Sequence, residues 1–295
     1  MNLERLQTFL KPAATSFQLG ISRFLFFSLV LVMTFPGKYA NFSLPPKALW
    51  LEHSFYQFLP WDIPTYDIFV GLEVFWRVSL LMAALGLMTQ VSVLLSFLLS
   101  LYILGIPMGF IPSDFHYQIP VLTMGVLVFA KSGTAFSVDR ILRKSRPATE
   151  PQQEFGWPLK LILFLLCTMY FKAGVSKLRL AGLSWFSSSH LLANLSYARP
   201  GYRYYLPEWT EVIYQWLIHQ ETLLLLLSSM TVLLELFSLV PFFVPRTLPI
   251  FAIIWVSFHL GVYLLMGIWS SIWLLPVYAF LIPWDRLLKK RELGS

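Results

Sequence analysis

Residues 156–178 read GWPLKLILFLLCTMYFKAGVSKL, and this stretch decides the fold class of the protein. An α-helix needs about 20 predominantly apolar residues to cross the hydrocarbon core of a bilayer, so the stretch predicts a transmembrane helix. It nevertheless carries Lys172 and Lys177, five residues apart. A charged lysine at the centre of a membrane helix costs about 2.5–3.5 kcal/mol on insertion scales, so each of them needs a structural or functional explanation.

The composition of the whole chain supports a membrane protein. Of its 295 residues, 57% are hydrophobic and only 13% are charged, whereas soluble domains have about 25% charged residues. Cys167 is the only cysteine, which excludes an intrachain disulfide and a cysteine metal cluster. The net charge of +7 is typical of basic cytoplasmic loops in membrane proteins, so nucleic acid is not an expected partner and membrane lipid is.

Further apolar stretches predict an all-α integral membrane fold with about eight transmembrane helices. Residues 1–295 are expected to form a single transmembrane domain without a C-terminal soluble domain. The predicted spans cover about residues 20–35, 66–87, 90–108, 117–130, 156–178, 223–244, 248–266 and 270–283.

Basic residues predict the orientation of these spans. Five lysines and arginines lie between Lys131 and Arg146, and four more lie in the C-terminal tail from Arg286 to Arg291. The positive-inside rule assigns both clusters, and with them both termini, to the cytoplasm of a multi-pass protein, which we expect in a bacterial inner membrane. An odd number of spans would place one basic cluster outside.

The segments left outside by this orientation are rich in aromatic residues. Residues 38–65 and 179–222 are the two long ones, and they include GKYANFSLPPKALW and SYARPGYRYYLPEW. Aromatic and partly amphipathic segments are typical of the membrane–water interface. We therefore expect them to form extracytoplasmic caps.

Several ionisable residues fall within the predicted spans. Glu73 and Arg77 are four residues apart, on one helix face, which favours a structural ion pair. Glu235 is expected to pair with Lys172 or Arg23, again as a structural contact. The full set is Arg23, Glu73, Arg77, Lys172, Lys177, Glu235 and His259.

Three of the ionisable residues are expected at a similar depth in the outer half of the membrane. Lys177 ends the span 156–178, His116 precedes the span 117–130, and His259 lies past the middle of its span. Desolvation disfavours the charged form of a lysine, which can then act as a base, and histidines beside it can transfer protons or stabilise an anion. A snorkelling lysine and histidines that link helices are the structural alternatives. Two histidines without a carboxylate do not predict a metal site.

The residues around Lys177 also resemble a known family. The stretch YFKAGVSKL (170–178), followed by LSWFSSSHLLANL, is similar to a segment of the horizontally transferred transmembrane (HTTM) family, which includes the vitamin K-dependent gamma-glutamyl carboxylases. Residues 75–101, 115–142 and 256–285 resemble further segments of that family, in the same order. The likeness covers roughly residues 15–290.

The resemblance implies a function for the three residues. Lys177 matches the lysine regarded as the base that deprotonates a reduced quinone, vitamin K hydroquinone, and His116 and His259 match two active-site histidines. In the family reaction, dioxygen then generates a strong base, and the glutamate carbanion takes up carbon dioxide. The resemblance thus implies a membrane enzyme, a carboxylase or a quinone-dependent oxygenase, with a reduced quinone, dioxygen and carbon dioxide as reactants.

The chain also departs from that pattern. Ser176 stands where the carboxylases have a lysine, and no extramembrane C-terminal region follows the last predicted span. A protein substrate docked through a propeptide is therefore not expected, although other relatives act in the maturation of secreted peptides. The alternatives are a non-catalytic or peptide-maturation factor for a secreted peptide and, third, a transporter, against which the lack of internal repeats argues.

Overall fold

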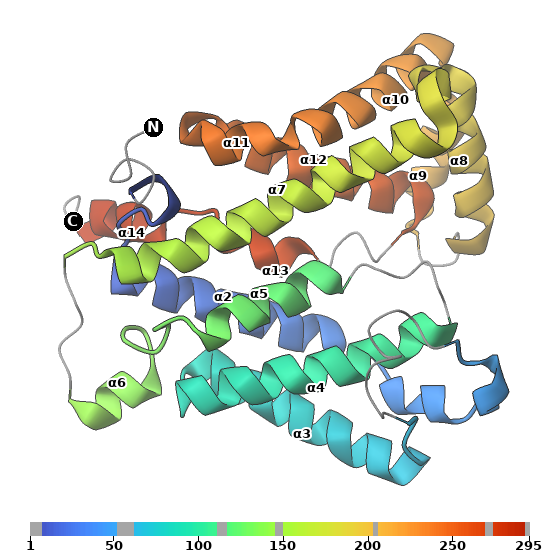
Figure 1. Cartoon of the computed structure of the whole chain (residues 1–295). Helices are drawn as coiled ribbons and strands as arrows, with labels where there is room; N and C mark the ends of the chain where they lie inside the picture. Colours follow the sequence, from blue (N-terminus) through green and yellow to red (C-terminus); the bar gives the residue numbers. More distant parts are fainter. Residues whose placement is uncertain are drawn as a thin grey trace. The chain divides into compact units, whose positions relative to one another are not determined.

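The protein is an all-α membrane protein. The computed structural model describes residues 8–51, 62–110, 117–144, 150–202, 206–268 and 274–292, and no β-strand occurs in these ranges. Six helical segments are long and apolar enough to cross a membrane. They are built on α2 (Ser16–Thr34), α3 (Tyr66–Leu85), α4 (Thr89–Phe110), α7 (Gln153–Ala181), α10 (Glu221–Leu236) and α12 (Leu248–Met266) (Figure 1).

Shorter helices connect and extend the six. The α-helices among them are α5 (Gln118–Val128), α6 (Val138–Arg143), α8 (Ser188–Tyr202), α9 (Trp209–Leu217), α11 (Val240–Phe243), α13 (Leu275–Tyr278) and α14 (Trp284–Glu292). The 3₁₀ helices are η1 (Tyr39–Ser43), η2 (Lys47–Leu49), η4 (Gly182–Phe186), η6 (Phe237–Leu239) and η7 (Pro245–Thr247).

Six of the eight predicted spans coincide with long helices, and the other two are shorter. The span predicted at 117–130 is α5, whose 11 residues rise about 17 Å at 1.5 Å per residue, about half of the ~30 Å hydrocarbon core. In the span predicted at 270–283, the described part begins at residue 274 and holds only the four-residue α13. The count of eight therefore stays a prediction.

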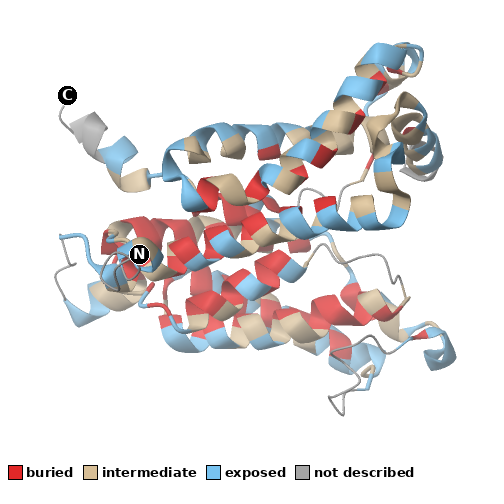
Figure 2. Ribbon diagram, turned by 45° about the horizontal axis from the view of Figure 1, so that its top comes forward, coloured by how far each residue is buried: buried red, intermediate tan, exposed pale blue. Residues whose placement is uncertain are grey.

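The chain divides into two compact units, of which unit 1 comprises residues 1–162 and 273–295. Its helix α3 packs against both α2 and α4, and buried residues line the facing sides of these helices (Figure 2). Small polar side chains lie between α3 and α4: Trp76 Nε1 donates to Ser100 Oγ at 2.7 Å, and Ser96 Oγ donates to Ser79 Oγ at 3.1 Å. Small residues allow such close helix packing in lipid, where the hydrophobic effect does not drive association.

The predicted pair of Glu73 and Arg77 is confirmed. Arg77 Nη2 lies 3.1 Å from Glu73 Oε2 on α3. The same nitrogen donates to the carbonyl of Gly37 at 2.5 Å, and Glu73 Oε1 accepts a short hydrogen bond from the backbone N–H of Ala40. Because both partners bind the backbone after α2, the pair fixes the start of the segment 38–51.

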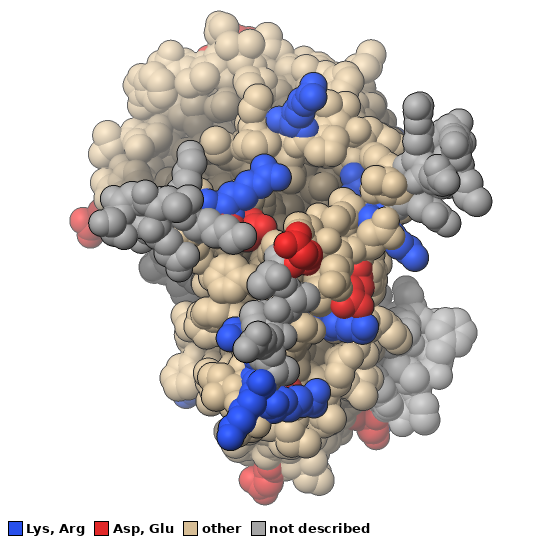
Figure 3. Space-filling model, turned by 90° about the vertical axis from the view of Figure 1, so that its left-hand side faces the viewer, with Lys and Arg blue, Asp and Glu red and all other residues tan. Residues whose placement is uncertain are grey.

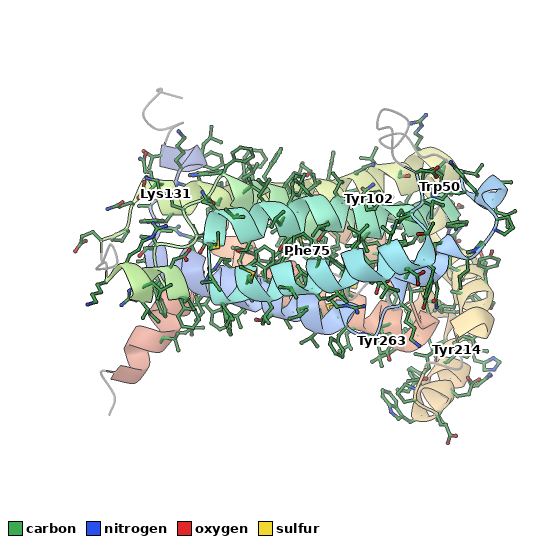
Figure 4. All side chains as sticks on the ribbon, turned by 90° about the horizontal axis from the view of Figure 1, so that it is seen from below. Trp50, Phe75, Tyr102, Lys131, Tyr214 and Tyr263 are labelled. Atoms are coloured by element: carbon green, nitrogen blue, oxygen red, sulfur yellow. The ribbon has the colours of Figure 1, made fainter. Side chains whose placement is uncertain are left out.

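The two ends of unit 1 differ in chemistry. Trp50 lies near one end of α4 and Lys131 near the other (Figure 4). Trp50 Nε1 donates to the carbonyl of Ile106 at 3.1 Å, and a Cβ atom added to Gly109 would lie only 2.0 Å from the same nitrogen. The basic residues at one end and the aromatic residues at the other fit the pattern on which the predicted orientation rests, and the assignment of the basic end to the cytoplasm stays a prediction.

Unit 2 comprises residues 163–272 and contains the second part of α7 and the helices α8, α9, α10 and α12. Helix α8 packs against α10 and α12, around a buried cluster of Leu195, Leu217 and Leu224. On α9, the exposed apolar residues Trp209, Val212, Ile213 and Trp216 share one face. Such a helix is typical of the membrane interface, and the outer position of residues 179–222 stays a prediction.

Candidate functional site

The site is built on one face of α7. Cys167, Tyr170, Gly174 and Lys177 follow one another at intervals of three or four residues, so they lie on the same side of the helix. Cys167 and Tyr170 are buried. The side chain of Lys177 is 22% exposed, so it ends this buried stripe at the C-terminal part of α7.

Gly174 brings α10 close to this face. A Cβ atom at Gly174 would lie 2.9 Å from Glu235 Cβ and 3.0 Å from the backbone nitrogen of Leu236. Further along the interface, Ser238 Oγ donates to the carbonyl of Cys167 at 2.9 Å. The glycine of the sequence AGVSK is therefore the residue that lets α10 approach within reach of the lysine one turn later.

Lys177 forms an ion pair with Glu235. Its Nζ atom lies 2.5 Å from Oε1 and 2.7 Å from Oε2, and the side chain of Glu235 is only 4% exposed. Both oxygens of the carboxylate thus face one ammonium group. In a medium of low dielectric constant this attraction offsets much of the cost of removing two charges from water.

The expected partners of Glu235 were therefore wrong. Lys172 is exposed on α7, and Arg23 Nη2 donates to the carbonyl of Phe136 at 2.5 Å. The reason is the helical register: Glu235 packs at Gly174, and Lys172, two residues earlier, points about 160° away. Lys177, three residues later, stays on the same side.

An aromatic group covers the ammonium. Lys177 Nζ lies 5.2 Å from the centre of the Trp185 ring, within the range of a cation–π contact. The Trp185 ring in turn lies 4.2 Å from the ring of His190, and its backbone carbonyl accepts a hydrogen bond from Ser228 Oγ at 2.5 Å. Gly182, with φ of 57°, provides the left-handed turn that ends α7 and starts η4.

His190 is a site residue that the sequence analysis did not single out. It lies in the first turn of α8, where its backbone N–H donates to Ser187 Oγ at 3.3 Å. The available signal was its position in LSWFSSSH, directly after the motif that carries Lys177. Trp185, in the same stretch, was also passed over.

His259 belongs to a second cluster on the same face of α7. Its Nε2 atom lies 2.6 Å from the hydroxyl of Tyr170, and the Tyr170 ring stacks on Trp255 at 5.0 Å. Tyr170 precedes Lys177 by seven residues, or about 10 Å along the helix axis. Lys177 and the residue that His259 contacts therefore lie about two turns apart on α7. His116 lies outside the described residues.

A cavity of about 360 Å³ opens between α8, α10 and α12. Its wall is almost entirely apolar and includes Leu191, Leu234 and Phe258, which are the sequence neighbours of His190, Glu235 and His259. Pockets of this size and lining hold small apolar ligands or part of a lipid chain. Lys177, Glu235, His190 and His259 do not line this cavity themselves, although three of them lie on the helices α8, α10 and α12 that enclose it.

The residues of the site offer proton-transfer chemistry. Lys177, Glu235, His190 and His259 can each exchange a proton, and the part of the chain that the structure describes holds no group of three His, Cys, Asp or Glu side chains suited to a metal ion.

Comparison with protein-family models, with curated proteins and with solved structures found no match to this chain.

Proposed function

We propose that the protein is an integral membrane enzyme that removes a proton from a lipid-soluble weak acid, with Lys177 as the base. The observation that carries this proposal is the pair of Lys177 and the buried Glu235, in a unit whose helices α8, α10 and α12 also enclose an apolar cavity of about 360 Å³. Charges at this depth are costly in a membrane protein, and they are typical of proton pathways and substrate sites.

The pair can supply a neutral amine without losing its own proton to water. The proton shared between Lys177 Nζ and Glu235 Oε1 or Oε2 lies on the carboxylate in the reactive form. The amine then accepts a proton from the substrate, so that the pair gains one positive charge and the substrate one negative charge. The new ammonium lies beside the new anion and stabilises it.

The neighbouring rings have supporting roles in this proposal. Trp185 covers one side of the amine and limits its access to water, which strengthens the electrostatic contacts. His190, whose ring lies 4.2 Å from that of Trp185, would accept the proton afterwards. His259 and Tyr170 share a hydrogen bond and could orient a hydroxyl group of the substrate, two turns deeper in α7.

The resemblance to the HTTM family supports a finer form of the proposal. A reduced quinone is a weakly acidic, lipid-soluble molecule whose ring and chain suit an apolar cavity. Its anion would then react with dioxygen, and carboxylation with carbon dioxide is the specific outcome that the resemblance implies, with His116 as a further site residue. The site would open to the outer half of a bacterial inner membrane, with both termini in the cytoplasm.

A non-catalytic factor that binds or matures a secreted peptide is the second candidate. The observation that favours it is the ion pair itself, since two contacts of 2.5 and 2.7 Å would also serve as a purely structural link between α7 and α10. The two candidates differ in what happens when the amine is removed and the fold is kept.

The test is the variant Lys177→Met, combined with Glu235→Gln so that no carboxylate is left unpaired. We expect the double variant to fold and to lose at least 10²-fold in oxygen consumption with a reduced quinone, because general base catalysis contributes about 10²–10⁴-fold. Small primary amines should restore part of the rate. Lys172→Met is the matched control, and its rate should equal that of the unchanged protein. Full activity in the double variant would leave only the structural role for the pair.

The orientation is tested separately by cysteine labelling. In a Cys167→Ala background, cysteines at the exposed positions Glu150 and Ser196 should react with an impermeant reagent from opposite sides of the membrane, Ser196 from outside. Reaction of both from one side would place the site at the wrong face. This outcome would not bear on the chemistry of the pair.

A further inference from the structure

A second cavity, in unit 1, is lined by cations. It measures about 510 Å³ and is enclosed by three elements: the start of α4, the loop that follows α5, and the helix α6. Lys131, Arg140 and Arg143 line it, against the single carboxylate of Asp139. Lys and Arg side chains gather on this end of unit 1, which carries α6 and the start of α7 (Figure 3). The proposed deprotonation site uses none of these residues.

The carboxylate in the cavity wall is already occupied. Asp139 Oδ1 accepts from the backbone N–H of Met88 at 2.8 Å, and Oδ2 accepts from the N–H and the hydroxyl of Thr89, both at 2.7 Å. Asp139 thus caps α4 with both oxygens, and neither Arg140 nor Arg143 lies within ion-pair distance of it. Arg140 has no carboxylate within ion-pair distance in the described ranges.

Lys131 in the cavity wall is neutralised, and one more cation, Arg23, is buried outside the wall. Lys131 pairs with Glu154 at 2.6 Å across an exposed contact. Arg23 is fully buried and donates to the carbonyl of Phe136, just before α6. Its Nε and Nη1 atoms lack a hydrogen-bond partner among the residues that the structure describes. The local balance is therefore positive, which favours an anion in the open volume.

Part of the cavity wall is apolar and exposed. Met88 and Val91 line the cavity and are 56% and 49% exposed, and Phe129, Ile141 and Leu142, next in sequence to lining residues, are 78%, 73% and 68% exposed. Large apolar side chains with this exposure beside basic residues are typical of a helix at the membrane interface. Apolar side chains do not stabilise a soluble anion. A phospholipid, by contrast, carries both a phosphate group and apolar chains.

We infer that this cavity binds a phosphate group, and that the phosphate is that of an anionic phospholipid in the cytoplasmic leaflet. Arg140 and Arg143 would bind the phosphate oxygens, since the guanidinium group matches their geometry. Met88 and Val91, in the cavity wall, would contact the acyl chains. Basic pockets at the cytoplasmic ends of transmembrane helices bind anionic headgroups in this way.

The test compares lipids by their effect on the purified full-length protein. Phosphatidylglycerol, phosphatidylcholine and inorganic phosphate are titrated separately in neutral detergent, and the thermal midpoint is followed at each concentration. Phosphatidylglycerol should raise the midpoint with saturation. The double variant R140Q/R143Q should bind it about thirtyfold more weakly, since each basic residue contributes roughly fivefold to the affinity.

Controls separate the possible outcomes. Arg246→Gln removes an exposed arginine that does not line this cavity, and it should keep the full response; the single variant R143Q replaces the double variant if the latter does not fold. Equal responses to phosphatidylglycerol and phosphatidylcholine would overturn the inference, as would an unchanged response in the arginine variants. A response to inorganic phosphate of the same size would assign the site to a soluble anion and overturn the lipid assignment.

Discussion

Two acid–base pairs within predicted spans differ in how their surroundings hold them. Glu73 and Arg77 lie on one helix, and both also bind the backbone, at Ala40 and Gly37. Lys177 and Glu235 come from two helices. Within the described residues, the further contact of the pair is between Lys177 and the ring of Trp185. Both pairs have a cation over an aromatic ring, Phe35 for Arg77 and Trp185 for Lys177, but only the first pair also has hydrogen bonds from both partners to the backbone.

The difference separates a structural ion pair from one that can transfer a proton. A pair whose polar atoms are bound to backbone cannot change its protonation without breaking several contacts at once. A pair held by one partner and one ring can transfer its proton with few changes elsewhere. Sequence spacing alone does not show this, because both pairs are simply an acid and a base in apolar segments.

The largest expected effect is on the structural pair. Arg77→Met should lower the free energy of unfolding by about 3–5 kcal/mol, because it leaves the carboxylate of Glu73 buried without a cation. Thermal and denaturant unfolding in detergent would measure it. The double variant Glu73→Gln with Arg77→Met should recover a large part of the loss, and a single-variant loss below about 1 kcal/mol would show that the pair is not structural.

The approach of α10 to α7 gives the next largest effect. Gly174→Ala should cost about 1–3 kcal/mol, because its Cβ atom would lie 2.9 Å from Glu235 Cβ, and it should also weaken the contact of Lys177 with Glu235. Gly71→Ala is the matched control, since a Cβ at that helix position meets no atom within 4 Å. Equal unfolding midpoints for the two variants would contradict the role assigned to Gly174.

A charge outside the spans extends the comparison to pH. Partial burial would raise the pKa of Asp139, but hydrogen bonds from Thr89 and Met88 and the charge of Arg143 outweigh it and hold the pKa below its usual range. Asp139→Ala should therefore cost about 1 kcal/mol at neutral pH, as the loss of a helix cap does.

The pH dependence of that cost has a defined sign. The stabilisation is present above the unfolded pKa of about 3.9 and is lost as the pH falls through the lower folded value. Unfolding of the two proteins in parallel should show their difference shrinking below that pH. A difference that grows on acidification would contradict the capping role.

The smallest effect is expected at Lys172. Because this lysine is exposed on α7 and Glu235 already binds Lys177, Lys172→Ala should change stability by less than about 0.5 kcal/mol. This reverses the expectation from the sequence, in which the loss of Lys172 would leave a carboxylate unpaired. Unfolding in detergent is the measurement, and a loss like that of Arg77→Met would restore the earlier assignment.

The sequence by itself determined the fold class and the chemistry available in the membrane. Long apolar stretches can satisfy their backbone hydrogen bonds in lipid only as helices, so composition and length were sufficient for six of the spans. The i, i+4 spacing of Glu73 and Arg77 was sufficient for that pair, because both residues belong to one helix whose geometry is known in advance.

Only the tertiary structure decided which charges meet across helices. Glu235 pairs with Lys177 and not with Lys172 because Gly174 fixes where α10 touches α7, and hydropathy contains no information on that contact. The same holds for Trp185, which lies over Lys177 after the turn at Gly182, for His190, whose ring contacts Trp185, and for His259, which binds Tyr170 two turns away from the lysine. Contacts between helices depend on rotation and axial register, and a sequence specifies these only through the packing of all the side chains together.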